Sequence, residues 1–391
     1  MECDDQHCFE NFAPLPSRAQ RHTIMRQECE HPSSMFLKSL LVATSGLFSL
    51  VMGCGLNAAT PPASSTPEDI ISKLKRQITE QENESAQAVA NYVPTINAKN
   101  DDLESPVVDV LRSLPGVAQV EVLVKSDRPT HRIIHLRDWH FVPKDAYAID
   151  MNDAHGRKLP EAEFDWLYQK LLLEVELVQI EQMAVLRILI KHHGLKRVFA
   201  EGFSPAQLDA YRERIAVLKA MEDEQIPRIR RQLDEVGRLL KDGADEKTQA
   251  IKTQLQTMLD EHRRRLLEMG AAGRLLIAGE LEEVLPLEDG DALEGASPIS
   301  ANGVTFDFEK IEARHDAQVS LVTKERTVAV IVLGGAHDLS ASVRRMSGNC
   351  EYLRVTTKGF GEREVKYDGL LPDPEQWHHE PNEKSSRRCR T

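Results

Sequence analysis

Aromatic residues and paired cysteines are both scarce in this sequence. Phe, Trp and Tyr make up 5% of the 391 residues, which argues against base-stacking platforms and against a carbohydrate cleft rich in Trp. The six cysteines are scattered without paired spacing, so neither a zinc ribbon nor a disulfide framework is predicted. Acidic residues outnumber basic ones by 62 to 49, and a chain of net charge −13 lacks the broad basic face that binds nucleic acid.

Three motifs of common hydrolases are also missing. The sequence contains no P-loop, no Gly-x-Ser-x-Gly and no His-Glu-x-x-His. Their absence disfavours nucleotide hydrolysis, α/β-hydrolase chemistry and zincin-type proteolysis. The composition, 41% hydrophobic and 28% charged, is that of a globular protein that can bury a sizeable core.

The first sixty residues have the pattern of an export signal. Lys38 supplies a positive charge, and an apolar run over residues 39–52 leads into Gly53 and Cys54. Fourteen residues are too few to cross a membrane and are typical of the hydrophobic part of a signal peptide. An aliphatic segment, a small residue and a cysteine in this order resemble a bacterial lipobox. We therefore predict a lipoprotein signal at 35–54 with Cys54 lipidated; a short buried helix with a chance cysteine is the alternative.

This signal predicts how the two ends of the chain are used. We expect residues 1–34 to be a mis-assigned start or a disordered extension, and residues 55–100 to be a tether followed by a peripheral helix. The lipid would hold the protein in the bacterial cell envelope, at the outer membrane or its periplasmic face. Residues 372–391 are charged and are expected to form a disordered tail.

Residues 101–371 alternate strand and helix patterns. The run Thr327–Leu333 is continuous, apolar and bounded by glycine, which is typical of a parallel strand buried on both faces. A long helix is predicted from Glu161 to His193 by its helical period of apolar residues. Further strands are expected at 120–124, 132–136 and 197–200, and a last edge strand at 351–357. We predict an α/β domain with a mostly parallel central sheet flanked by helices.

Residues 205–270 interrupt this alternation. They are dense in Glu, Arg, Lys, Gln and Leu, with Pro227 inside the segment and a turn at Asp242-Gly243. The pattern predicts an inserted long helical hairpin with coiled-coil character. It would either mediate self-association as a homo-oligomer or lie against the sheet as a solvated helix pair.

Polar residues follow three of the predicted strands. Asp138 and His140 follow the first of them, Glu201 follows the second, and His337 and Asp338 follow the third. Because the carboxyl ends of parallel strands line the ligand crevice of an open sheet, these residues are expected to converge.

Two imidazoles and a carboxylate form a set that zinc, manganese or iron accepts. We predict His140, Glu201 and His337 as ligands of a divalent transition metal. The same three side chains can also work without a metal, as a general base and its electrostatic partner. For His140 beside Trp139, an ordinary hydrogen-bonded turn histidine is an equally weighted alternative.

Other residues are predicted to support this set. Arg314, on a helix over 308–323, would bind an anionic group or hold Glu201, unless it forms a plain structural ion pair. Asp316, Asp138 and Asp338 are expected to orient the imidazoles through hydrogen bonds to their other ring nitrogens.

At these residues the chain resembles the broad superfamily of ChaN-like, erythromycin-esterase-like and TraB/Tiki-like proteins. The resemblance covers about residues 132–357 and lies in four short motifs: Arg137–His140, Val198–Gly202, Ala313–Asp316 and Gly334–His337. The last matches the Gly-x-x-His of the superfamily in full. The first has Arg where Gly is common and Asp where Glu is frequent.

The resemblance implies several activities. Tiki-like members are metal-dependent proteases, erythromycin-esterase-like members are hydrolases with a histidine base, and ChaN-like members are lipoproteins that bind haem. The leading expectation is a membrane-anchored, metal-dependent hydrolase of a small molecule or peptide, with His140, Glu201, His337 and Arg314 as catalytic residues. The alternatives are a haem- or iron-binding lipoprotein, with a histidine or Tyr147 as ligand, and a non-catalytic scaffold that uses the hairpin.

Overall fold

The computed structural model describes residues 66–94 and 107–361, apart from short gaps at 156, 242–244, 297–298, 301–302, 305–306, 326 and 347. The predicted signal with Cys54, the tether and the tail at 372–391 lie outside the described residues. Among the helices that are described, none is long and apolar enough to cross a membrane.

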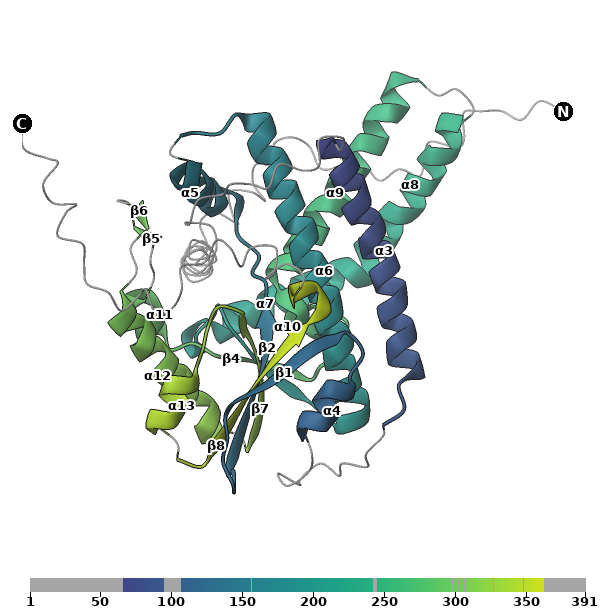
Figure 1. Cartoon of the computed structure of the whole chain (residues 1–391). Coiled ribbons are helices and arrows are strands. Elements are labelled where there is room, and N and C mark those ends of the chain that lie inside the picture. The colour runs from purple at the N-terminus through teal and green to yellow at the C-terminus, as the bar shows by residue number, and fades with distance from the viewer. Residues whose placement is uncertain are drawn as a thin grey trace, which may run out of the picture.

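A six-stranded sheet forms the centre of the fold (Figure 1). Its strand order is β1-β8-β2-β7-β3-β4. All neighbouring strands are parallel except β1 and β8, which are antiparallel. The predicted α/β class with a mostly parallel sheet is confirmed. The strands are β1 (Val117–Val124), β2 (His131–Asp138), β3 (Arg197–Ala200), β4 (Glu283–Pro286), β7 (Val328–Gly334) and β8 (Cys350–Thr357).

Strand β7 lies in the interior of the sheet, between β2 and β3. Ala329, Ile331 and Leu333 pack into the core on one face, whereas Val330 and Val332 pack into the core on the other. Burial on both faces is why this strand is apolar without alternation.

The edge of the sheet differs from the sequence-based expectation. Strand β8 was expected at the edge, but it pairs with β1 on one side and β2 on the other. Seven of its eight residues are buried, and the edge position belongs to β1, whose burial pattern is mixed. β8 is therefore an interior strand, although it contains Glu351, Arg354 and two threonines.

Helices cover both faces of the sheet (Figure 1). Helix α6 (Glu161–His193) packs in the larger core, with α3 (Pro67–Asn91), α4 (Val107–Ser113) and α10 (Gly270–Ile277). Helices α12 (Phe308–Glu325) and α13 (Ser340–Met346) pack in the core on the opposite face. The remaining short elements are α5 (Lys144–His155), η1 (Pro205–Gln207), α11 (Gly290–Gly295) and the paired strands β5 (Ile299–Ser300) and β6 (Gly303–Val304).

Helix α3 belongs to the core, in contrast to the expected peripheral helix. Thr66 begins it with a capping box to Asp69, and it runs beside α6 (Figure 1). Ile71, Leu74 and Ile78 recur on one face and are 9%, 9% and 2% exposed. Ser85 is the one buried residue after Ile78, so the apolar stripe fades as its sequence indicates. The folded core therefore includes residues well before 101.

The inserted segment is helical, as predicted. Helices α7 (Leu208–Ala220) and α8 (Ile226–Lys241) are joined by a π-helical turn, η2 (Met221–Gln225), and α9 (Glu246–Glu268) packs against α8. The turn ends two residues before Pro227, which has no N–H to donate, and the Ile226 N–H donates to the Met221 carbonyl in the i to i−5 pattern of a π-helix. Self-association through this segment stays a prediction.

Candidate active site

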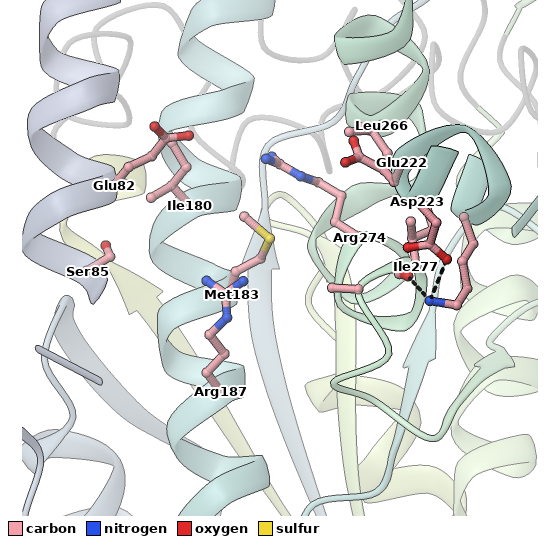
Figure 2. A pocket seen from close by; sticks show the side chains of 12 residues that line it. Glu82, Ser85, Ile180, Met183, Arg187, Glu222, Asp223, Leu266, Arg274 and Ile277 are labelled. Carbon is pink, nitrogen blue, oxygen red and sulfur yellow. Dashed lines mark hydrogen bonds and ion pairs between the residues drawn. The ribbon is translucent and has the colours of Figure 1, made fainter. Parts of the chain in front are cut away.

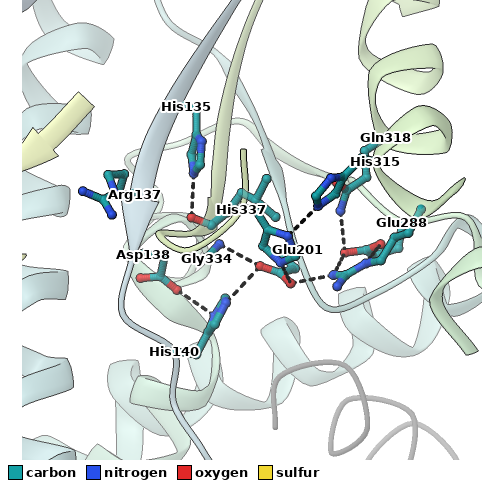
Figure 3. Close-up of polar contacts among 12 residues, drawn as sticks. His135, Arg137, Asp138, His140, Glu201, Glu288, His315, Gln318, Gly334 and His337 are labelled. Atoms are coloured by element: carbon teal, nitrogen blue, oxygen red, sulfur yellow. Dashed lines mark hydrogen bonds and ion pairs between the residues drawn. The ribbon is translucent and has the colours of Figure 1, made fainter. Parts of the chain in front are cut away.

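The carboxyl ends of β2, β7 and β3 bring most of the predicted site residues together (Figure 3). Asp138 pairs in register with Gly334 across β2 and β7, and Glu201 directly follows the end of β3. Gly202 adopts a φ of 100°, a conformation that favours glycine, and turns the chain immediately after Glu201.

The Glu201 carboxylate is the centre of the cluster. Its Oε2 atom lies 3.1 Å from His140 Nε2 and accepts a hydrogen bond of 2.8 Å from the Gly334 N–H. Its Oε1 atom lies 3.3 Å from His337 Nε2. Both imidazole contacts are within ion-pair distance but lack hydrogen-bond geometry. Each imidazole thus faces a different oxygen of one buried carboxylate.

Arg314 holds this carboxylate from the side of α12. Its Nη2 atom lies 2.5 Å from Glu201 Oε1 and 2.5 Å from Glu288 Oε1, and its Nε donates to Glu288 Oε2 at 3.0 Å. Burial opposes the charge of Arg314, but Glu288 and Glu201 together raise its pKa. Of the roles that the sequence left open, the geometry favours holding Glu201.

Glu288 was missed by the sequence analysis. It is fully buried and also accepts a hydrogen bond of 3.1 Å from Gln318 Nε2. It follows β4 by two residues, so it repeats the design of a strand followed by a carboxylate. That signal was present in the sequence, but β4 has only four residues and was not recognised as a strand.

His140 is a buried imidazolium between two carboxylates. Its Nδ1 lies 3.3 Å from Asp138 Oδ2, and Asp138 Oδ1 accepts a hydrogen bond of 2.9 Å from Gln182 Nε2. Burial alone would lower the pKa of His140, but Glu201 and Asp138 outweigh it and raise the pKa to about 10. Burial likewise opposes the charge of Glu201, yet His140 and Arg314 hold its pKa well below the usual range. Both groups are therefore charged at neutral pH.

His337 and His315 form a second, neutral pair. His337 Nδ1 lies 2.7 Å from His315 Nε2, and the two rings meet edge to face at 5.0 Å. Burial lowers the pKa of both groups, and that of His315 falls well below its ordinary value. His315 was not predicted as a site residue, because its contact depends on how α12 is rotated against the sheet.

Close contacts with neighbouring side chains explain the two glycines at the end of β7. A Cβ atom on Gly334 would lie 2.1 Å from His140 Nε2, and one on Gly335 would lie 2.1 Å from Phe360 Cζ. Neither glycine has a positive φ. The sequence indicated a close approach here, and the groups that approach are the site histidine and the Phe360 ring, which also lies 4.3 Å from the Arg137 guanidinium.

Three predicted residues lie apart from this cluster. Asp316 was expected to orient an imidazole, but it pairs with Arg345 at 2.6 Å on the outer side of α12. Asp338 accepts from the Ser340 N–H at 2.8 Å and so caps the start of α13. Tyr147 is 2% exposed, and its ring packs against Phe164 and Tyr168, which gives the haem alternative no support.

A small cavity of about 70 Å³ borders the charged residues. Asp138, His140 and Glu201 contribute to its wall, whereas His337 and Arg314 do not. The opposite wall comes from residues 267–272, where α9 ends and α10 begins, and Gly270 turns the chain there with a φ of 66°. The end of the inserted segment and the start of α10 thus form part of the wall of this cavity.

No family model, curated protein or solved structure matches this chain. The resemblance to the ChaN-like, erythromycin-esterase-like and TraB/Tiki-like superfamily accordingly stays a prediction.

The arrangement gives the predicted metal site no support. Within residues 66–94 and 107–361, gaps aside, no group of three or more His, Cys, Asp or Glu side chains is arranged to hold a metal ion. His140 and His337 face different oxygens of Glu201, and the Arg314 cation lies 2.5 Å from one of those oxygens. A second cation there would be repelled, and the geometry favours the alternative in which histidine and carboxylate act without a metal.

Proposed function

We propose that the chain is a hydrolase of small esters or amides in which Glu201 activates water and His140 donates a proton. The observation that carries this proposal is the buried series Asp138, His140 and Glu201, which borders a cavity at the carboxyl ends of the strands. In this proposal the enzyme is held at the cell envelope by a lipid on Cys54.

His140 is suited to be the proton donor. A pKa of about 10 keeps it charged at neutral pH, so it can donate from Nε2 to an oxygen or nitrogen that gains negative charge. Asp138, 3.3 Å from Nδ1, fixes the orientation of the ring and stabilises its charge.

Glu201 is suited to accept the proton of water once a substrate is bound. In the free site its low pKa makes it a weak base, and His140 is the largest of the charges that lower this pKa. A substrate carbonyl that accepts a hydrogen bond from His140 Nε2, while the proton stays on the ring, replaces the Glu201 contact and weakens the attraction between the two charges. The pKa of Glu201 then rises, so substrate binding itself makes the base stronger.

The steps balance without a further reactant. Water adds to the carbonyl carbon and gives one proton to Glu201, the bond to the leaving group breaks, and His140 supplies the proton that the leaving group takes. Transfer of the Glu201 proton back to His140 restores the resting ion pair, once the ring turns so that Nε2, 3.1 Å from Oε2 in the resting site, is aligned for a hydrogen bond.

The size of the cavity indicates the substrate class. About 70 Å³ accommodates a group the size of an acetyl or propionyl unit beside His140 and Glu201. Longer acyl chains would meet the wall formed by residues 267–272. We therefore expect activity to fall steeply as the acyl group lengthens.

Hydrolysis of p-nitrophenyl acetate and p-nitrophenyl hexanoate by the full chain tests this proposal. His140→Gln and Glu201→Gln should each lower kcat/KM for the acetate ester by about 100-fold or more. His131→Gln is the matched control, because His131 begins the same strand at its opposite end and should leave the rate unchanged. Equal rates in all four proteins would refute the proposal.

Chelation separates the two mechanisms that the residues could support. The same assay is repeated after dialysis against a chelator, with elemental analysis of the dialysed protein. Retained activity without bound metal supports the proposal. Activity that is lost and then restored by zinc would replace it with the metal-dependent mechanism.

A further inference from the structure

A second cavity, of about 370 Å³, lies among α3, α6, η2 and α10 (Figure 2). Its wall combines apolar side chains, such as Met183 and Ile277, with the cations Arg187, Lys219 and Arg274. A volume of this size and a mixed wall of this kind are typical of sites for small organic molecules.

Among the described residues, two charges of this wall lack an ion pair: Arg274, and Glu82 on α3, whose side chain is exposed to water. Arg187 forms two hydrogen bonds of 2.7 Å to Glu280, and Lys219 lies 3.4 Å from Asp223. Arg274 instead donates to a neutral group, Gln179 Oε1, at 3.2 Å. In the part of the chain that the structure describes, no carboxylate lies within ion-pair distance of its guanidinium. Burial lowers the pKa of Arg274, and the carboxylates of Glu176 and Glu82, which lie beyond ion-pair distance, offset this only in part.

The guanidinium is also fixed in position. Gln179 is 1% exposed, and its Nε2 donates to the Leu267 carbonyl at 2.9 Å, which leaves Oε1 to orient Arg274. The remaining guanidinium nitrogens are not enclosed by protein, and Figure 2 shows the side chain reaching into the space between α6 and α10. A cation that is held before a ligand arrives loses less entropy when the ligand binds.

The π-helical turn η2 completes the wall on one side. It supplies Glu222 and Asp223, and both are already engaged, Glu222 with His262 at 2.7 Å and Asp223 with Lys219. Both acids of this turn therefore have partners and Glu82 is solvent-exposed, which leaves Arg274 as the one cation of the described wall without an ion pair. Such π-helical turns recur at functional sites.

We propose that this cavity binds a small organic anion, whose carboxylate or phosphate pairs with Arg274 and whose apolar part contacts Met183 and Ile277. A planar guanidinium can form two parallel hydrogen bonds to either head group. Gln179, which orients Arg274, borders the cavity beside His140, so one buried amide links the two sites. The binding site does not depend on the proposed hydrolase activity.

Calorimetric titration of the full chain with benzoate and with phenyl phosphate tests the proposal. At least one probe should bind saturably with one site per chain, and Arg274→Gln should weaken its Kd at least tenfold. Arg265→Gln is the matched control: it removes the same charge from α9, where Arg265 pairs with Glu261, and should leave Kd within twofold.

A second variant keeps the charge and removes the space. Ala278 lines the cavity at its exposed edge, so Ala278→Phe should obstruct entry and abolish binding while the circular dichroism spectrum stays unchanged. Preference for one probe identifies the head group. No saturable binding of either probe, or equal weakening by Arg274→Gln and Arg265→Gln, would overturn the proposal.

Discussion

Replacing Gly334 by alanine is the sharpest test of the site geometry. The added Cβ would lie 2.1 Å from His140 Nε2, whereas ordinary contact begins at 3.4 Å, so the imidazole must move by about 1.3 Å. Because Gly334 lacks a positive φ, the backbone itself tolerates alanine. The disturbance therefore falls on His140 and its contact with Glu201.

The displacement should be visible in the charge of His140. A pKa of about 10 keeps the ring protonated at pH 8, and loss of the Glu201 contact moves this pKa toward its ordinary value of 6.5. A fall of one unit in the pKa of His140 corresponds to about 1.4 kcal/mol of lost stabilisation of its charged form. We expect at least that much, measured from the nitrogen chemical shifts of histidine-labelled protein across the titration. In the proposed hydrolase, a misplacement of about 1 Å would also lower kcat about 100-fold.

The neighbouring Gly335→Ala variant provides a matched control. Its Cβ would overlap the Phe360 ring by the same distance, 2.1 Å, but the group that it disturbs lies outside the charged series. Both variants should lose about 1–3 kcal/mol of stability through overpacking. Only Gly334→Ala should change the His140 titration. An unchanged titration in Gly334→Ala, or equal changes in both variants, would refute the geometric reasoning.

Three further predictions concern stability. The pKa of His140 is higher in the folded than in the unfolded state, so the stability that this group contributes is complete below pH 6.5 and is lost as pH rises toward 10. In urea denaturation, the free energy of unfolding of His140→Gln should not show this decline at alkaline pH. Burial lowers the pKa of His135 to about 3, so native stability should fall as pH drops below 6.5, and less steeply in His135→Phe. Ile78→Ala should cost about 2–5 kcal/mol and the half-buried Ile70→Ala distinctly less, measured by chemical denaturation.

Fold class was readable from the sequence because its strongest signal comes from a strand buried on both faces. An apolar run such as that of β7 can pack on both faces in few ways other than inside a parallel sheet. The position of β8 was not readable, since its mixture of apolar residues with Glu351, Arg354 and two threonines is also typical of an edge strand. Helix α3 was misplaced because its apolar residues become sparse after Ile78, and this more polar remainder suggested a peripheral segment.

The site was predictable where it depends on topology. Asp138, His140, Glu201 and His337 all follow strand ends, and a parallel sheet places such ends side by side. Contacts made by helix residues were less accessible, because they depend on the rotation of the helix against the sheet. Asp316, two residues from Arg314, therefore points to a different partner.

The charged series is difficult to explain as a device for stability. Asp138, His140, Glu201, Arg314 and Glu288 have side chains that are 12% exposed or less, and their charges alternate in sign along the series. Removing such ions from water costs several kcal/mol each, and apolar residues of similar volume often stabilise a core as well or better. A chain that needed only a packed core at the ends of β2, β3 and β4 would not require them. Alternating buried charges beside a cavity instead give each group a fixed protonation state and position, which is what proton transfer to and from a bound substrate requires.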